Sequence, residues 1–143
     1  MRIKNKVLSI VDKYGTNDPV ELAERMNIEI VCPPLESVNV LGMFVSILNQ
    51  KIIVCNGFLA PPSRAVIIAH ELGHAVQHDN LSMFMLRDHT LFPTGKLENQ
   101  ANRFAAELLI PDEMIHKYKG YTTSEIASIE NIHPQLFKYK KFI

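Results

Sequence analysis

An apolar segment over residues 64–78 carries two histidines and a glutamate near its centre. Its apolar residues, with no proline among them, predict a buried helix whose N-cap is Ser63. On such a helix His70 and His74 lie on one face, with their Cβ atoms about 5–6 Å apart. Two imidazoles at this spacing can both bind one tetrahedral zinc ion, at about 2.0–2.1 Å each. The segment therefore predicts a buried helix that supplies two metal ligands.

Glu71 directly follows the first of these histidines, so the segment reads His-Glu-x-x-His. A carboxylate at this position can face an attacking water without ligating the metal, and can accept a proton from that water as a general base. The pattern therefore indicates a hydrolytic zinc centre with Glu71 as its catalytic residue. The alternative interpretation is a surface helix on which two histidines occur by chance.

Catalytic zinc sites take three protein ligands and leave one position for water. We expect the third ligand to be Glu98, in the first turn of a helix predicted over residues 96–110 and ended by Pro111. Asn102 lies one turn further along the same face, so its amide can orient a ligand. The competing interpretation of Glu98 is a carboxylate that is merely favoured by the helix dipole.

Other side chains are weaker candidates. Glu107 comes nine residues after Glu98 and points away from that helix face. His78 is a further turn beyond His74, but three histidines on one straight helix span about 12 Å of its axis and cannot easily surround one ion. We therefore expect His78 to line the pocket or support a ligand. The residue that stabilises the oxyanion is left open among His89, His116, His133, Tyr118 and Tyr121.

The remaining pattern predicts one α+β domain over residues 1–143, mainly helical with a small sheet and with a short helical C-terminal end at 112–143. Residues 79–95 are expected to be irregular. Two β-rich runs at 41–48 and 52–55 predict a hairpin, which offers either an edge for an extended substrate or only core sheet. The other predicted elements are helices at 3–14, from Pro19 to Met26, at 112–118 and at 123–130, a strand at 28–31 and a last turn at 134–140.

Charge and composition limit the partners. Lys and Arg together number 15, as do Asp and Glu, so the chain lacks the basic excess that nucleic-acid binding requires. The start of the chain does not resemble a signal peptide, and no window approaches the roughly 20 apolar residues of a membrane span. Cys32 and Cys55 are expected to be reduced, buried thiols. We therefore expect a cytoplasmic protein with no direct nucleic-acid or membrane partner; the oligomeric state is not indicated.

Two motifs together resemble one known family. Residues 69–74, AHELGH, followed by residues 98–111, ENQANRFAAELLIP, are similar to the ImmA/IrrE metallo-endopeptidases, which are bacterial and phage proteins of the gluzincin type. The resemblance implies a zincin-like metallopeptidase domain with His70, His74 and Glu98 as ligands of Zn²⁺ and Glu71 as the base. Thermolysin-like enzymes have an aspartate where Asn102 stands here.

The resemblance also implies a substrate, because members of this family cleave helix-turn-helix repressors of phages and mobile elements at specific sites. The expected function is therefore a zinc-dependent endopeptidase whose protein partner is such a repressor. The alternative is a non-proteolytic, antitoxin-like regulatory protein that keeps the zinc fold and binds a repressor or toxin. An intact base favours the enzyme, since a purely structural zinc ion has no use for one.

Overall fold

The computed structural model describes residues 2–36, 41–78, 84–87, 91–92 and 94–141 and shows a mixed α+β fold, as predicted. Its strands are β1 (Ile28–Val31), β2 (Gly42–Ile47), β3 (Gln50–Cys55) and β4 (Phe84–Arg87). Its helices are α1 (Ile3–Tyr14), α2 (Pro19–Arg25), α3 (Pro61–Gln77), α4 (Lys96–Leu109), α5 (Asp112–Lys117) and α6 (Thr123–Glu130), followed by the 3₁₀ helix η1 (Pro134–Tyr139). No helix of this described part combines the length and apolar character needed to cross a lipid bilayer.

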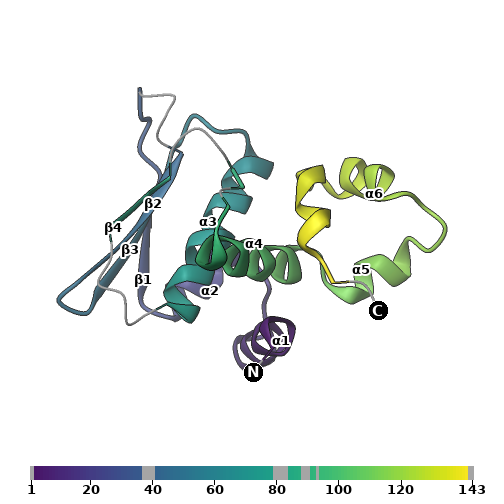
Figure 1. Ribbon diagram of the computed structural model, residues 1–143, viewed down its shortest axis with the longest axis horizontal. Coiled ribbons are helices and arrows are strands. Elements are labelled where there is room, and N and C mark those ends of the chain that lie inside the picture. Colours follow the sequence, from purple (N-terminus) through teal and green to yellow (C-terminus); the bar gives the residue numbers. More distant parts are fainter. Residues whose placement is uncertain (1, 37–40, 79–83, 88–90, 93, 142–143) are drawn as a thin grey trace.

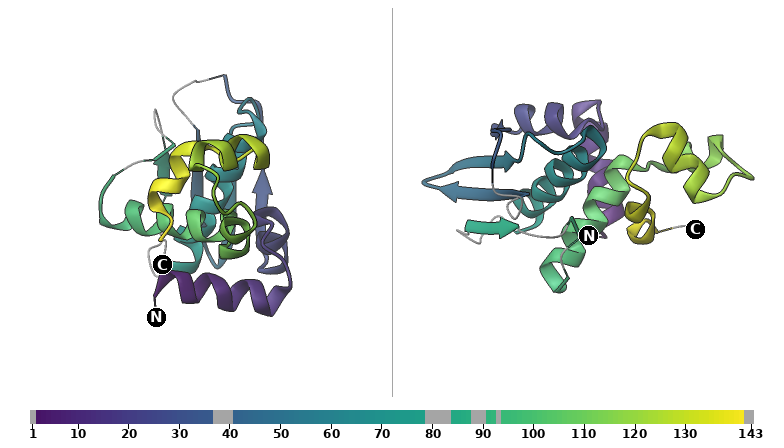
Figure 2. Two further views of the ribbon diagram at one scale, coloured as in Figure 1. Left: turned by 90° about the vertical axis from the view of Figure 1, so that its right-hand side faces the viewer. Right: turned by 90° about the horizontal axis from the view of Figure 1, so that it is seen from above.

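The elements are stacked in layers around α3 (Figure 1). The four strands form one sheet in the order β1-β3-β2-β4, in which β1 runs parallel to β3 and the other two pairs are antiparallel. Helix α3 packs between this sheet and α4, and both α1 and η1 pack against α4. The C-terminal elements α5, α6 and η1 lie at the end of the molecule remote from the sheet (Figures 1 and 2).

The predicted hairpin is present, with a tighter turn than expected. Leu48 and Asn49 both have positive φ, 51° and 65°, as the two central residues of a type I′ hairpin turn require. Gln50 pairs with Ile47 and already belongs to β3. Both hairpin strands are interior strands of the sheet, because β3 also pairs with β1 and β2 also pairs with β4. The idea that the hairpin offers a free edge to a substrate is therefore wrong; the edges are β1 and β4.

Helix α3 begins three residues earlier than the sequence pattern predicted. Its N-cap is Ala60, and Pro61 and Pro62 occupy the first turn, so Ser63 is not the cap. Proline suits this position because its fixed φ is helical and its missing N–H would have no partner in a first turn anyway. In α2 the N-cap is Asp18, whose side chain accepts a hydrogen bond from the backbone N–H of Val20.

The segment predicted to be irregular contains a strand. Phe84–Arg87 forms β4 and pairs with β2, which the local sequence did not indicate. Residues 79–83, 88–90 and 93 lie outside the described part, and with them the predictions for that part of the segment, including His89. Both cysteines are free, as predicted, and Cys55 is buried as expected. The prediction that Cys32 is buried is wrong, since that residue is exposed directly after β1.

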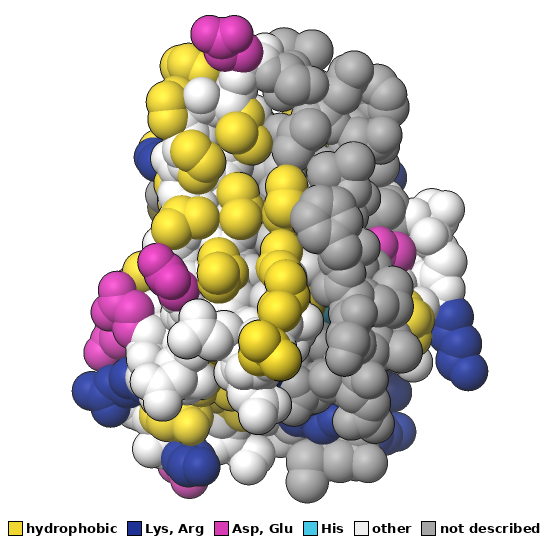
Figure 3. Space-filling view, turned by 90° about the vertical axis from the view of Figure 1, so that its left-hand side faces the viewer, with side chains coloured by type: hydrophobic (Ala, Val, Ile, Leu, Met, Phe, Trp, Pro, Cys, Tyr) yellow, Lys and Arg dark blue, Asp and Glu magenta, His cyan; other side chains and the backbone are white. Residues whose placement is uncertain are grey.

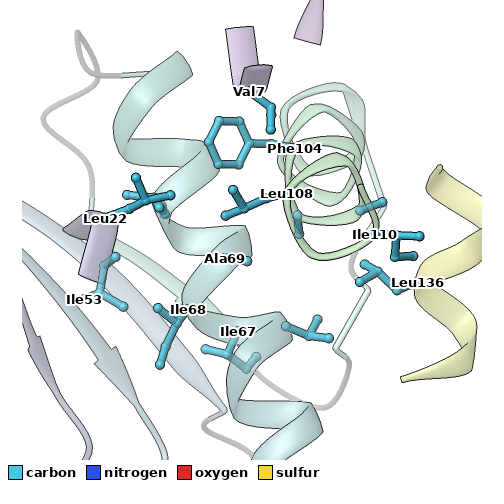
Figure 4. Packing of buried hydrophobic residues seen from close by; sticks show 14 of the residues in the cluster. Val7, Leu22, Ile53, Ile67, Ile68, Ala69, Phe104, Leu108, Ile110 and Leu136 are labelled. Atoms are coloured by element: carbon cyan, nitrogen blue, oxygen red, sulfur yellow. The ribbon is translucent and has the colours of Figure 1, made fainter. Parts of the chain in front are cut away.

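One close approach fixes α3 and α4 relative to each other. A Cβ atom added at Gly73 would lie 3.0 Å from Cβ of Phe104, so the missing side chain lets α4 approach α3. Figure 4 shows Phe104 and Leu108 of α4 beside α3, with Ile68 of α3 directed toward the sheet. The sheet face turned away from the helices is largely apolar (Figure 3), and includes Val31 and Ile47. The closely packed α3–α4 pair positions the site.

Candidate metal centre

Helix α3 holds His70 and His74 on one buried face. Each side chain is only 1% exposed, and their Nε2 atoms lie 3.1 Å apart. The rings meet edge to face, with centroids 4.8 Å apart. The i, i+4 spacing of a helix produces this convergence, because both Cα–Cβ bonds point to the same face. The two nitrogens are therefore directed at one point in space.

Helix α4 brings Glu98 to the same point. Its Oε1 atom lies 2.8 Å from Nε2 of His70 and 2.6 Å from Nε2 of His74. Burial opposes ionisation of this carboxyl, but the contacts with His70 and His74 outweigh that cost and hold its pKa far below the usual range. Glu98 is therefore a carboxylate at neutral pH, with its charge directed at the two imidazoles.

These three donor atoms fit a small divalent cation. The ligand atoms that His70, His74 and Glu98 can offer all lie within 4.8 Å of one another. In a tetrahedral zinc site with bonds of about 2.0–2.1 Å, neighbouring ligand atoms are about 3.3 Å apart, which is slightly wider than the separations here. Two imidazoles and one carboxylate also form the ligand set of a common class of catalytic zinc sites. The donor set and its geometry therefore suit Zn²⁺, and the structure brings together the three residues that the sequence proposed.

Asn102 supports His70 from behind. Its Oδ1 atom lies 2.7 Å from Nδ1 of His70, and the Asn102 side chain is buried. A carbonyl oxygen can only accept a hydrogen bond, so the proton of the neutral imidazole is held on Nδ1. Nε2 of His70, which faces the donor atoms of His74 and Glu98, would then offer its lone pair to a bound metal ion. This is the orienting contact that the sequence pattern suggested for Asn102.

His78 is a neighbour of the centre and lies behind one of its ligands. Its Nδ1 atom is 2.9 Å from Nδ1 of His74, on the side of that ring opposite the converging atoms. Its Nε2 atom is 2.7 Å from Oε1 of Gln100 in α4. This agrees with the expectation that His78 supports the site. Sequence reasoning did not single out Gln100, because its reach to His78 depends on how α3 and α4 pack.

Glu71 lies in α3 between the two histidines and is also buried, at 1% exposure. A buried carboxylate is costly unless it is paired or placed near a cation. At this position it is adjacent in sequence to one proposed ligand and shares the buried face of the helix, which suits a base held close to a metal centre.

Glu107 does not belong to the site. Its Oε1 atom accepts a hydrogen bond from Nζ of the buried Lys140 at 2.6 Å, and its Oε2 atom accepts one from the backbone N–H of Lys141. Among the oxyanion candidates, Tyr118 packs edge to face on Tyr121, and His133 caps η1. None of these contacts leads to the three converging atoms, so the oxyanion-stabilising residue stays unassigned.

Known proteins resemble this chain in sequence over most of its length. The family model described as the IrrE N-terminal-like domain matches residues 23–132, which include His70, Glu71, His74, Glu98 and Asn102. A relative from Bacillus phage phi105, called "Uncharacterized immunity region protein 2", is 34% identical over 140 residues, which are 96% of this chain and 88% of the relative.

A second relative comes from Bacillus subtilis (strain 168) and is called "Metallopeptidase ImmA". It is 32% identical over 142 residues, which are 96% of this chain and 83% of that protein. Metallopeptidases use a divalent metal ion, and the His70, His74 and Glu98 cluster is compatible with one. With a family model that covers most of its length and relatives aligned almost end to end, this chain belongs to the ImmA/IrrE family of metallopeptidases.

Proposed function

We propose that the chain is a zinc-dependent endopeptidase that cleaves a helix-turn-helix repressor of a phage or mobile element. The observation that carries the proposal is the convergence of Nε2 of His70, Nε2 of His74 and Oε1 of Glu98 within 2.6–3.1 Å of one another. Three electron-rich atoms so close together need a positive charge between them. The family membership supports the choice of a metal ion as that charge.

The proposed roles of the residues follow from this arrangement. His70, His74 and Glu98 hold the zinc ion, and Asn102 keeps the lone pair of His70 directed at it. When bound, zinc makes water more acidic and polarises a peptide carbonyl. Glu71 accepts a proton from the attacking water while the water oxygen bonds to the carbonyl carbon. The same carboxyl then gives that proton to the amide nitrogen as the C–N bond breaks, leaving a carboxylic acid and an amine, which become carboxylate and ammonium at neutral pH when the remaining proton passes to the amine.

The proposed substrate rests on the family rather than on a surface of this chain. The chain resembles metallo-endopeptidases that cleave helix-turn-helix repressors, and the phage relative is named as a protein of an immunity region. Both facts support a protein substrate that controls phage or mobile-element genes. The neutral overall charge, with 15 basic and 15 acidic residues, suits a protein partner better than DNA.

The test is a cleavage assay with the purified chain, zinc and a candidate helix-turn-helix repressor. Wild type should cut the repressor at one site, a chelator should stop cleavage, and Glu71→Gln should bind zinc but leave the repressor intact. Glu113→Gln, at an exposed glutamate of α5, is the matched control and should cleave normally. Cleavage by zinc-loaded Glu71→Gln would refute the assignment of the base. A stable complex with uncut repressor would instead favour the non-proteolytic regulator.

A further inference from the structure

A third histidine, His78, directly follows the last residue of α3 and contacts the second proposed ligand on the side away from the converging atoms. The rings of His74 and His78 have centroids 5.1 Å apart, and their Nδ1 atoms are 2.9 Å apart. The other nitrogen of His78 is 2.7 Å from Oε1 of Gln100. His78 is not part of the group whose donor atoms converge. Its two polar contacts therefore link a ligand on α3 to a side chain on α4 without reaching the centre itself.

The direction of the hydrogen bonds can be followed from Gln100 inward. A carbonyl oxygen only accepts, so Nε2 of His78 carries the proton and donates to Gln100. In the neutral imidazole Nδ1 of His78 is then a bare acceptor, and the 2.9 Å contact requires Nδ1 of His74 to be the donor. With its proton on Nδ1, His74 has a lone pair on Nε2, which is the atom that faces Glu98.

We propose that His78 and Gln100 form a relay that fixes the proton of His74 on Nδ1 and thereby leaves Nε2 open to the metal. His78 is in this view a positioning residue. The inference rests on the proposed zinc centre and adds to it, because it gives His74 the kind of partner that Asn102 gives His70. Side chains of α4 then set the tautomers of both proposed histidine ligands. Asn102 acts on His70 directly, and Gln100 acts on His74 through His78.

The side chain of Gln77 joins α3 and α4 by hydrogen bonds close to this relay. Nε2 of Gln77 donates to the backbone oxygen of Gly73 within α3 and to the backbone oxygen of Gln100 in α4, each at 3.2 Å. This bridge holds the backbone of Gln100 next to the end of α3, where His78 lies. The distance from Gln100 to His78 is therefore set by helix packing, as an orienting contact requires.

Zinc affinity, measured by competition with a chromogenic chelator, tests the relay without relying on proteolysis. His78→Phe keeps a ring but removes both nitrogens and should weaken zinc binding about 10- to 100-fold, the usual effect of losing such a partner. His78→Asn places an oxygen near the position of Nδ1, so it should accept from His74 and restore most of the affinity. His116→Phe, at an exposed histidine of α5, is the matched control and should bind like wild type.

A second pair of variants tests the outer end of the relay. Gln100→Glu can only accept from His78 and should keep the wild-type affinity, whereas Gln100→Leu should weaken binding. Thermal unfolding of each zinc-free variant shows whether the fold is intact. Absorption spectra of the cobalt-substituted proteins should be alike for wild type and His78→Asn, since His78 is not a ligand.

The outcomes separate the relay from the zinc centre. Wild-type affinity in a folded His78→Phe would overturn the relay alone. Equal losses in His78→Phe and His78→Asn, with an altered cobalt spectrum in both, would show that His78 ligates the metal and would also overturn it. If His78→Phe does not fold, equal zinc affinity of Gln100→Glu and Gln100→Leu would overturn it instead. A wild type that binds no zinc would overturn both proposals.

Discussion

Nδ1 of His70 lies 2.7 Å from Oδ1 of Asn102, and this buried contact joins α3 to α4 across 32 residues of sequence. Helix α4 therefore has two roles at the proposed centre: it supplies Glu98, and through Asn102 it orients His70. Any shift of α4 along α3 would change a ligand and a supporting residue at once. The close contact between Gly73 and Phe104 restricts such a shift.

Replacement of Asn102 should therefore weaken metal binding without removing a ligand. In Asn102→Leu the imidazole of His70 loses its acceptor, and we expect zinc affinity to fall about 10- to 100-fold. Asn102→Asp keeps an acceptor oxygen and should bind at least as tightly as wild type. Isothermal titration of zinc into the metal-free proteins measures both. Equal affinity of wild type and Asn102→Leu would show that this contact does not orient the ligand.

Gly73→Ala should destabilise the protein although alanine is the better helix former. The added methyl group would lie 3.0–3.2 Å from Cβ, Cγ and Cδ1 of Phe104, so α3 and α4 would have to move apart. Overpacking of this kind costs about 1–3 kcal/mol, which exceeds the roughly 1 kcal/mol gained in helix propensity. Urea unfolding measures the change, with Asn99→Ala at an exposed position of α4 as the control. A more stable Gly73→Ala would contradict the tight packing.

Lys140→Met should strongly destabilise the protein although Lys140 lies outside the metal centre. Nζ of Lys140 is 2.6 Å from Oε1 of Glu107 and 2.7 Å from Oδ1 of Asp112, and both Lys140 and Glu107 are buried. Loss of the cation leaves a buried carboxylate, which costs about 3–5 kcal/mol. The exposed Lys138 two residues earlier provides the control Lys138→Met. The double change Glu107→Met with Lys140→Met should recover most of the loss, and failure to do so would refute the charge argument.

Asp112 gives a prediction for the dependence of stability on pH. Hydrogen bonds from Lys140 and Lys4 lower the pKa of its carboxyl below the ordinary value. A lowered folded-state pKa stabilises the protein above the unfolded value, and this contribution is lost as the pH falls through the folded value. At pH 7, Asp112→Asn should therefore be less stable than wild type by about 0.5–1 kcal/mol, as for a half-exposed ion pair.

Below about pH 4, near the ordinary pKa of aspartate, the difference between Asp112→Asn and wild type should shrink. Urea midpoints measured from pH 7 to pH 2 show this directly. Asp12→Asn, at an exposed aspartate of α1, is the control. A difference that stays constant down to pH 2 would show that the carboxylate charge of Asp112 does not contribute.

Local sequence patterns predicted the elements that carry the proposed ligands. The apolar spacing of α4, with Pro111 after it, predicted the bounds of that helix to within one residue. The i, i+4 spacing of the two histidines in α3 predicted that they share one face of the helix. The approach of Glu98 to both histidines could be proposed because zinc needs a third ligand and few acidic residues follow on a suitable helix face. These predictions needed only periodicity and coordination chemistry.

Features that depend on tertiary contacts were missed. Strand β4 is only four residues long and exists through its pairing with β2, so its own sequence carries no signal. The order of strands, which makes both hairpin strands interior, was equally invisible. The link from His74 through His78 to Gln100 requires α3 to pack closely on α4. The missing side chain at Gly73 allows this close packing. The start of α3 was predicted three residues too late. Ser63 matches the pattern of an N-cap residue, but Pro61 and Pro62 already occupy the first turn of the helix.

The zinc content of the purified chain tests the central claim most directly. Elemental analysis after dialysis should give about one zinc ion per wild-type chain, and far less in His74→Ala and Glu98→Gln, because each removes one of three proposed ligands. Glu113→Gln should retain the wild-type content. Wild type without zinc, or a Glu98→Gln variant that binds zinc as tightly as wild type, would contradict the proposed centre.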